Sequence, residues 1–459
     1  MVVEIEILKP YALNYSDLII LSSPSSCSSS SSSSEEQMLQ LNSIRGKIME
    51  ALGPSGPGLL SITGVPNVNL LRKRLLPLAR KLSLLPNNVR AQILKDHGLG
   101  SDVPLKNLDR VVSSFAQHLK LSPLHDLTSG RTAFDQCKHD IDENGRNQIL
   151  HKKLGSNCVN ELEGFEFDIL GNTFKELGFC MMELGYRLAR ICDNVINGRE
   201  LEDSILESCS AKGRLIHYHS TLDTRLLKKS ANMKMKKKKN ALKMSPSIFK
   251  EIPSEQTNSN NPLISGVKHC PTSFSDLWQQ WHYDYGIFTI LTSPMFLSSS
   301  VEPKYDMKRH FVSNAVECSS PHGHTYLQLL DVSTNKVLVV ETDAESFIVQ
   351  VGEAADIFSK GMLRSTLHSV CRPDGFENIS RENFVVFIQP AWGRVMNAPS
   401  EHDDRDNKSE SLSYNPLIQD ILKTVPSLTS RLKPGMTFGE FSKETTKQYY
   451  GDGDMKSGR

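Results

Sequence analysis

The sequence has no Cys-x-x-Cys pair, no long apolar run and almost no net charge. Its nine cysteines are odd in number and irregularly spaced, which excludes a disulfide framework and fits a reducing compartment. No apolar stretch approaches the ~20 residues that a membrane-spanning helix needs. The first residues are acidic where a signal peptide is basic. We therefore expect a soluble protein that does not bind membranes and is cytoplasmic, with the nucleus as an alternative.

The charge balance also bears on partners. Charged residues make up 23% of the chain and the net charge is +1, so no overall field favours nucleic acid. One tract departs from this balance, because lysines cluster between Lys228 and Lys239. Such a tract can contact phosphates or act as a nuclear-import signal, but no aromatic residues interleave with it. A solvated loop is the favoured interpretation.

Composition divides the 459 residues into four parts. Residues 1–35 end in a serine tract and are predicted to be a disordered tail. Residues 36–205 carry apolar residues at helical spacing and are predicted to form a helical region that packs on the rest. Residues 206–395 read as short strands, with disordered insertions predicted near 221–265 and 296–324. Residues 396–459 are predicted to be a charged tail followed by a helix that begins near Phe438.

The strand-rich part sets the predicted fold class. Strands are expected at 214–219, 281–291, 326–330, 336–340, 347–351, 366–371 and 383–388. Many short strands separated by turns favour an antiparallel double-sheet barrel, mainly β with flanking helices. A strict apolar stripe from Leu170 to Val195 predicts a long helix, and packing onto the sheet of the same chain is preferred to a coiled coil.

The stretch 281–291 is the chemical centre of the sequence. It is rich in aromatic and β-branched residues and is predicted to be one strand. Side chains alternate along a strand, so His282 and Asp284 should point to the same face. An imidazole and a carboxylate on one face are two-thirds of a 2-His-1-carboxylate site for Fe(II). The pattern alone is weak, since roughly one such pair is expected by chance and His402 begins another.

Later residues can complete such a site. His368 lies on a predicted strand that follows a turn and is placed to be the third ligand. Arg381 and Asn383 share one face of the next strand, where a guanidinium and an amide can hold a carboxylate.

These motifs together resemble the plant-type 2-oxoglutarate- and Fe(II)-dependent oxygenases, which share the isopenicillin N synthase-like jelly roll. The resemblance is carried by H-x-D at His282, then G-x-x-x-S-x-x-H ending at His368, then Arg381 with Pro390 nine residues later. The segments 59–66, 214–218, 349–353 and 438–441 also look like family strands and the C-terminal family motif. Two features depart from the family pattern. Asn383 replaces the usual Ser, and in the strand at 214–219 Ile216 and His219 replace the usual Asn and Pro.

The resemblance implies a double-stranded β-helix (jelly roll) core and an enzyme. It implies that His282, Asp284 and His368 bind Fe(II), and that Arg381, with Asn383 and Tyr218, binds the cosubstrate 2-oxoglutarate. It further implies oxidation of a small organic molecule by O2, with release of succinate and CO2 and with ascorbate as a reductant. The alternative is a catalytically weak or inactive protein of the same fold with a binding or regulatory role.

Overall fold

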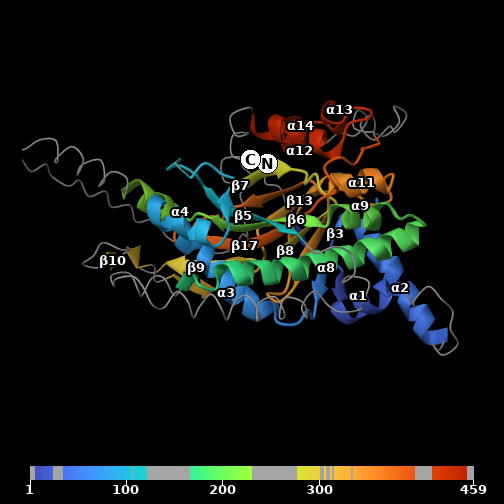
Figure 1. Ribbon diagram of the computed structural model, residues 1–459, viewed down its shortest axis with the longest axis horizontal. Coiled ribbons are helices and arrows are strands. Elements are labelled where there is room, and N and C mark those ends of the chain that lie inside the picture. The colour runs from blue at the N-terminus through green and yellow to red at the C-terminus, as the bar shows by residue number, and fades with distance from the viewer. Residues whose placement is uncertain are drawn as a thin grey trace, which may run out of the picture.

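Two β-sheets with helices on their outer sides make up the molecule (Figure 1). The computed structural model describes residues 6–23, 35–105, 107–120, 166–229, 277–299, 304–305, 311–312, 315–331, 334–397 and 416–451. The serine tract, most of the lysine tract and the predicted charged loop near 400–412 lie outside these residues. Among the described helices, none has the length and apolar character needed to cross a lipid bilayer.

The smaller sheet carries two of the predicted metal ligands. Its order is β1 (Glu6–Leu8), β14 (Lys336–Val340), β13 (Leu327–Asp331), β16 (His368–Cys371) and β7 (Leu277–His282). β1 runs parallel to β14, and the other neighbours are antiparallel. The β-branched and aliphatic side chains of β14 suit a pleated, half-buried surface, and this strand has the bounds that the sequence predicts.

The larger sheet has β17 at its centre. Its order is β2 (Ala12–Asn14), β3 (Leu59–Thr63), β15 (Phe347–Val351), β8 (Phe288–Thr292), β17 (Ile379–Ile388), β6 (Ser210–Tyr218), β5 (Val112–Lys120) and β4 (Gly100–Ser101). The first half of β17 also pairs with β9 (Met295–Ser299), which pairs with β12 (Ala315–Cys318). A separate antiparallel pair joins β10 (Lys304–Tyr305) and β11 (Phe311–Val312).

Alternation along the strands divides the apolar core. Phe384, Val386 and Ile388 of β17 face the helices, whereas Val385 faces the smaller sheet. The inter-sheet core also takes Trp278 from β7 and Leu329 from β13. The space between the two sheets is therefore partly filled by side chains from both, and the polar residues described below lie on its walls.

Helices cover the outer face of the larger sheet. They are α1 (Tyr15–Ser22), α2 (Glu35–Leu52), α3 (Val68–Leu84) and α8 (Leu170–Ile196), and α8 runs the length of the sheet in Figure 1. The apolar stripe of α8 is buried in the same core as β17, so the predicted packing of this helix onto the chain's own sheet is confirmed. The shorter helices α4 (Asn87–Asp96), α9 (Glu200–Ser208) and α11 (Glu353–Phe358) lie at the sheet ends.

A C-terminal group of helices lies over the smaller sheet (Figure 1). It consists of α12 (Pro416–Thr424), α13 (Leu428–Arg431) and α14 (Phe438–Tyr450), and α14 begins where the sequence predicts. Ile418 and Ile421 of α12 pack with Trp281 of β7 in a third core. The Thr437 hydroxyl and the Glu440 carboxylate cap the start of α14 reciprocally.

The ends of the predicted segments differ from the structure in two places. Residues 6–23, assigned to a disordered tail, supply β1 to the smaller sheet, β2 to the larger one, and α1 with Leu18 and Leu21 buried. The partners of β1 and β2 are the distant strands β14 and β3, which the local pattern does not reveal.

Parts of the predicted insertions are also regular structure. Residues 221–229 are helical, with Asp223 fully buried. β9 and β12 fall near or within 296–324, and Phe296 and Leu297 are buried against β17. The remainder of the first insertion, from residue 230, lies outside the described residues.

The prediction of one strand over residues 281–291 is wrong. β7 ends at His282, and β8 begins at Phe288 in the other sheet. Between them the chain crosses from sheet to sheet at Gly286, where an added Cβ would lie 2.6 Å from the carbonyl oxygen of Ile388 and the backbone of Ile287 donates to that same oxygen. The aromatic and β-branched composition predicts extended backbone and contains no signal for a change of sheet other than this glycine.

Replacing Gly286 with alanine should therefore destabilise the fold. The added methyl would push against backbone rather than a flexible side chain, and we expect a loss of about 1–3 kcal/mol in the free energy of unfolding measured in urea. Gly46→Ala is the matched control, because nothing lies within 4 Å of its Cβ position on an exposed face of α2. That change should be neutral or stabilise by up to about 1 kcal/mol. Equal stability of the two variants would contradict the crossing described here.

Candidate functional site

Three side chains predicted to bind metal converge between the sheets. His282 ends β7, His368 begins β16, and the two are directly opposed in the antiparallel register. Asp284 lies in the connection that follows β7, not on the strand. One donor atom from each residue lies within 4.8 Å of the others. Nε2 of His282 is 3.7 Å from the Asp284 carboxylate, and Nε2 of His368 is 3.6 Å from it.

Backbone carbonyls orient both imidazoles. Nδ1 of His282 is 2.7 Å from the carbonyl oxygen of Gln280, and Nδ1 of His368 is 2.9 Å from that of Thr366. A carbonyl can only accept, so each Nδ1 must carry the proton. That tautomer leaves an Nε2 lone pair on each ring directed toward Asp284, which is the arrangement a metal ligand requires.

The surroundings of His282 also favour the protonation state that metal binding requires. Burial, and then the charge of His368, lowers the pKa of His282 to about 4. The imidazole is therefore neutral at physiological pH, and neutral imidazole is the form that binds a metal. The backbone of Asp284 is held as well, because its carbonyl accepts from the Glu353 amide at the start of α11 (2.8 Å).

The donor set fits a divalent first-row metal. Two imidazole nitrogens and one carboxylate grouped on one side leave coordination positions open on the other, which is the pattern of non-haem Fe(II) sites. Asp284 and His368 are buried. Buried polar groups normally have partners, and within the described part of the chain these three side chains have only each other and the two backbone carbonyls.

A second polar group lies further along the same interior. Arg381 of β17 is 1% exposed, and its Nε donates to the carbonyl oxygen of Thr325 (3.0 Å). Its Cζ lies 5.1 Å from the ring centre of Tyr218, the register partner at the end of β6. Nη1 of Arg381 is buried with no hydrogen-bond partner among the described residues. A buried guanidinium with an orphaned N–H fits a carboxylate ligand.

Asn383, predicted to bind the cosubstrate, forms a hydrogen bond within the protein. Its Oδ1 accepts from the Thr292 hydroxyl (2.7 Å), and that hydroxyl also accepts from the Phe384 amide (3.1 Å). Asn383 is 1% exposed and shares the interior side of β17 with Arg381. Its carbonyl oxygen is therefore committed to the protein, which leaves only the amide nitrogen to meet a ligand.

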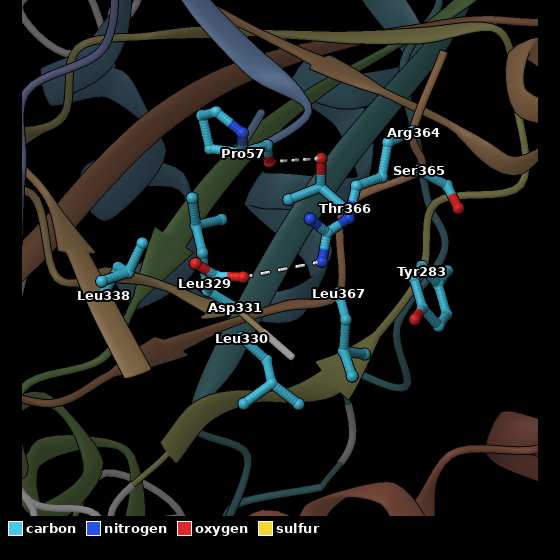
Figure 2. Close-up of a pocket in the computed structure, with 10 residues that line it drawn as sticks. All are labelled: Pro57, Tyr283, Leu329, Leu330, Asp331, Leu338, Arg364, Ser365, Thr366 and Leu367. Carbon is cyan, nitrogen blue, oxygen red and sulfur yellow. Dashed lines mark hydrogen bonds and ion pairs between the residues drawn. The ribbon is translucent and has the colours of Figure 1, made fainter. Parts of the chain in front are cut away.

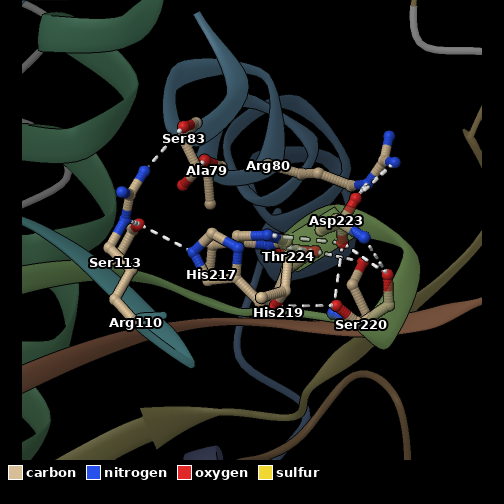
Figure 3. A network of polar contacts seen from close by, with 12 residues as sticks. Ala79, Arg80, Ser83, Arg110, Ser113, His217, His219, Ser220, Asp223 and Thr224 are labelled. Carbon is tan, nitrogen blue, oxygen red and sulfur yellow. Dashed lines mark hydrogen bonds and ion pairs between the residues drawn. The ribbon is translucent and has the colours of Figure 1, made fainter. Parts of the chain in front are cut away.

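A buried ionic network lies on the opposite side of these two strands (Figure 3). His217 and Glu382 are register partners, adjacent to Tyr218 and Arg381 but pointing the other way. Nδ1 of His217 is 2.9 Å from the Glu382 carboxylate, and its Nε2 is 3.5 Å from Asp223. Asp223 pairs with Arg80 of α3 at 2.6 Å and accepts from the Ser220 hydroxyl. This network fixes the register in which Tyr218 and Arg381 face the site.

One contributor to the site could not be located from the sequence. Tyr449 of α14 places its ring 6.4 Å from that of His282, and its hydroxyl accepts from the Tyr283 amide (3.2 Å). The predicted C-terminal helix contains this residue, but only the docking of α14 over β7 reveals the contact.

A small pocket lies beside the triad (Figure 2). Tyr283, Leu329 of β13 and Arg364 line it, with Arg364 3.8 Å from Asp331. Its volume is about 30 Å³, enough for one or two water molecules and too small for an organic substrate.

No family model and no curated protein matches the chain. Solved structures with a similar course include a full-length Neurospora crassa protein in complex with alpha-KG and 5-formyluracil (12% identity, 95% of this chain and 94% of that chain, TM-score 0.42). JOX2 in complex with 2OG, Fe and JA has 14% identity over 87% and 81% (TM-score 0.43). AtDAO1 from Arabidopsis thaliana, a dioxygenase for auxin oxidation, has 14% identity over 86% and 98% (TM-score 0.41).

One of these structures contains 2OG and Fe, one is a dioxygenase with 2-oxoglutarate, and the Neurospora crassa structure contains alpha-KG. At such low identities and TM-scores they assign neither the reaction nor the substrate of this chain. Its function has to be inferred from its own side chains.

The ionic network of Figure 3 generates a stability prediction. Asp223→Ala should destabilise the protein by about 3–5 kcal/mol, because the buried guanidinium of Arg80 would lose its carboxylate counterion. Burial opposes ionisation of Asp223, but Arg80 and His217 outweigh it and hold its pKa below the ordinary value. A carboxylate with a depressed pKa stabilises the fold above its unfolded pKa and ceases to do so as the pH falls through the folded value.

The free energy of unfolding, measured by urea titration, should therefore differ between wild type and Asp223→Ala by a constant amount near neutral pH. Below roughly pH 4 this difference should become smaller. Asp203→Ala is the control, since its ion pair with Arg199 is exposed and 3.7 Å long. It should cost less than about 1 kcal/mol. A cost for Asp223→Ala as small as that of the control would contradict the network.

Proposed function

We propose that this protein is a 2-oxoglutarate- and Fe(II)-dependent oxygenase with a double-stranded β-helix (jelly roll) core, acting on a small organic molecule. The convergence of His282, Asp284 and His368, with both Nδ1 atoms bonded to backbone carbonyls, is the observation that carries the proposal. The orphaned Nη1 of Arg381 supports a carboxylate ligand in the same interior. Membership of the plant-type group remains a prediction from the sequence motifs.

The proposal assigns each side chain a task. His282, Asp284 and His368 would hold Fe(II), and Arg381 would bind the distal carboxylate of 2-oxoglutarate with the Tyr218 hydroxyl and the Asn383 amide nitrogen beside it. Burial raises the pKa of Tyr218, partly offset by Arg381, so the hydroxyl keeps its proton and can donate. Iron with 2-oxoglutarate and O2 supplies an oxidant together with succinate and CO2, and ascorbate would serve as the reductant that keeps the iron ferrous.

The protein would orient the metal ligands and exclude water from one side of the site. The Gln280 and Thr366 carbonyls hold both rings with Nε2 inward, and the α11 amide holds the backbone of Asp284. The ring of Tyr449 of α14 lies 6.4 Å from that of His282. Exclusion of water on this side would protect a reactive centre and strengthen the electrostatic contacts within it.

Iron and cosubstrate binding test the proposal directly. The purified protein should bind one Fe(II) and, without oxygen, develop a weak visible charge-transfer band when 2-oxoglutarate is added. His368→Ala should lose both, because it removes one of three ligands. His322→Ala is a matched control, since this histidine is outside the cluster. Iron and band at wild-type strength in His368→Ala would contradict the ligand assignment, and a band without succinate release in air would favour the regulatory alternative.

Arg381 should matter for the cosubstrate and not for the metal. Arg381→Ala would leave a buried carboxylate without its partner, so 2-oxoglutarate binding should weaken by about 3–5 kcal/mol, several hundredfold or more. Arg381→Lys should retain part of the affinity, because lysine offers a point charge without the fork. Both should bind iron as the wild type does. Equal 2-oxoglutarate affinity in wild type and Arg381→Ala, titrated by the charge-transfer band, would shift attention to Arg372 and Arg364.

A further inference from the structure

A second arginine faces the interior between the sheets. Arg214 of β6 lies two and four residues before Ile216 and Tyr218, which both belong to the inter-sheet core, so all three point inward. The Arg214 guanidinium lies over the ring of Phe387 of β17, with Cζ 4.8 Å from its centre. Phe387 also packs against the inter-sheet core. Arg214 is therefore part of the inner wall of the larger sheet and not of its outer surface.

Strand register places Arg214 at the level of the metal ligands. Phe288, Ile388 and Ala211 are aligned across β8, β17 and β6, directly after the chain leaves His282 and Asp284. From the other end, Tyr218 lies beside Trp278 of β7, with ring centres 5.6 Å apart. His282 is four residues along β7 from Trp278, which is about 13 Å of extended strand. Arg214 is four residues along β6 from Tyr218, which is the same length. Starting from the Tyr218–Trp278 contact, the two residues are therefore at a similar level.

The charges on this wall agree with that placement. Burial lowers the pKa of Arg214, but the carboxylate of Asp102, and then Tyr285, Tyr450 and Asp284, raise it above the ordinary value. The guanidinium thus experiences the charge of the metal ligand Asp284 across the interior.

Positive charge on the wall exceeds negative charge. The Asp102 carboxylate lies 2.6 Å from Nε of Arg214 and 3.1 Å from Nζ of Lys212, so one carboxylate serves two cations. No hydrogen bond within the described residues engages either Nη atom of Arg214, and its ion pair with Asp102 is closest at Nε. The side chain is 31% exposed, so these N–H groups are accessible. A guanidinium whose two Nη groups make no hydrogen bond, in a positively charged environment, is suited to bidentate binding of an anion with two oxygens.

Two neighbouring polar side chains also have no partner. Gln350 of β15 and Thr289 of β8 are register partners on the inward face of their strands, and Thr289 is in turn aligned with Phe387. Both are buried, at 1% and 2% exposure. The amide oxygen and nitrogen of Gln350 and the hydroxyl of Thr289 make no hydrogen bond within the described structure. Buried polar atoms without protein partners are typical of a wall that meets a ligand or ordered water.

We propose that this wall, formed by Arg214, Phe387, Thr289 and Gln350, binds the primary substrate, and that the substrate is a small organic acid whose carboxylate pairs with Arg214. The proposal rests on the proposed function, because it places the substrate beside the iron ligands. The stacking on Phe387 provides an apolar surface next to the guanidinium, so the acid should carry an apolar body. A single guanidinium and a shared lysine match a monoanion better than a dianionic phosphate.

A cleft adjoins the neighbouring strand β5. It has a volume of about 500 Å³ and is lined by His118 and Lys120 of β5, by residues 207–210, and by Ala391 and Trp392. His118 is the register partner of Lys212, so the cleft adjoins the row that carries the second cation.

Binding of matched acids and esters tests the proposal. The probes are 3-phenylpropanoate and octanoate against their methyl esters, titrated calorimetrically into anaerobic protein loaded with Fe(II) and 2-oxoglutarate. The acids should bind the wild type at least tenfold more tightly than the esters. Arg214→Met should weaken acid binding at least tenfold and leave ester binding as it is, and Arg214→Lys should fall between. Arg225→Met, which removes an exposed arginine paired with Glu377, should behave as the wild type.

Several outcomes would overturn the inference. Acids and esters that bind wild type equally, or acids that bind Arg214→Met as well as wild type, exclude a carboxylate at Arg214. Tighter binding of phenyl phosphate than of 3-phenylpropanoate would make the ligand a phosphate ester. A loss of 2-oxoglutarate affinity in Arg214→Met as large as in Arg381→Ala would assign Arg214 to the cosubstrate. Failure of the proposed function is distinct, since the charge-transfer band would then be absent in every variant, including the wild type.

Discussion

The contact between Gly286 and the Ile388 carbonyl determines how the candidate site is assembled. It allows the chain to pass from the smaller sheet to the larger one within the few residues between β7 and β8. A second glycine is needed at the same point, since a Cβ on Gly352 would lie 2.3 Å from the Gly286 carbonyl oxygen. Because the crossing is so short, a ligand at the end of one sheet and a ligand in the connection lie beside the inner wall of the other sheet.

The two faces of the β6–β17 pair have different chemistry. Toward the helices, His217, Glu382, Asp223 and Arg80 are linked by buried ion pairs. Toward the smaller sheet, Arg381 and Arg214 have N–H groups that make no hydrogen bond within the described residues. A buried polar network that is satisfied holds structure, whereas a polar wall that is not satisfied is suited to binding. The same two strands therefore provide both the support and the candidate binding surface.

The sequence predicted the triad by a partly mistaken route. His282 and Asp284 do meet His368, but they do so around a chain crossing and not along one strand, and the two geometries share the same spacing in sequence. β14 and β15 follow from short runs rich in β-branched residues, and the start of α14 follows from the helical spacing of its buried residues Phe438, Phe441 and Thr445. β5, by contrast, was not predicted. Ser113 and Ser114 are buried whereas His118 and Lys120 are exposed, so the polar residues show no simple alternation, and only the pairing with β6 makes this segment a strand.

The candidate substrate wall could not be predicted for a related reason. Arg214 looks like an ordinary surface arginine at the start of a strand, and no local feature states that it faces inward. Gln350 carried the one available signal, a long amide in the apolar strand Phe347–Val351, where a buried polar residue without a neighbouring partner is unusual. Recognising that signal requires knowing that both faces of the strand are covered.

The support of the triad by the C-terminal helices bears on when the site matures during synthesis. Arg431 of α13 forms a buried ion pair with Glu353 of α11, whose amide donates to the Asp284 carbonyl. The Tyr449 hydroxyl accepts from the amide of Tyr283, the residue before Asp284. All three donor residues have left the ribosome well before these contacts can form. A nascent chain that already contains His368 therefore has a loosely held triad, and the rigid geometry is acquired only after residues 431–449 have been made and have docked.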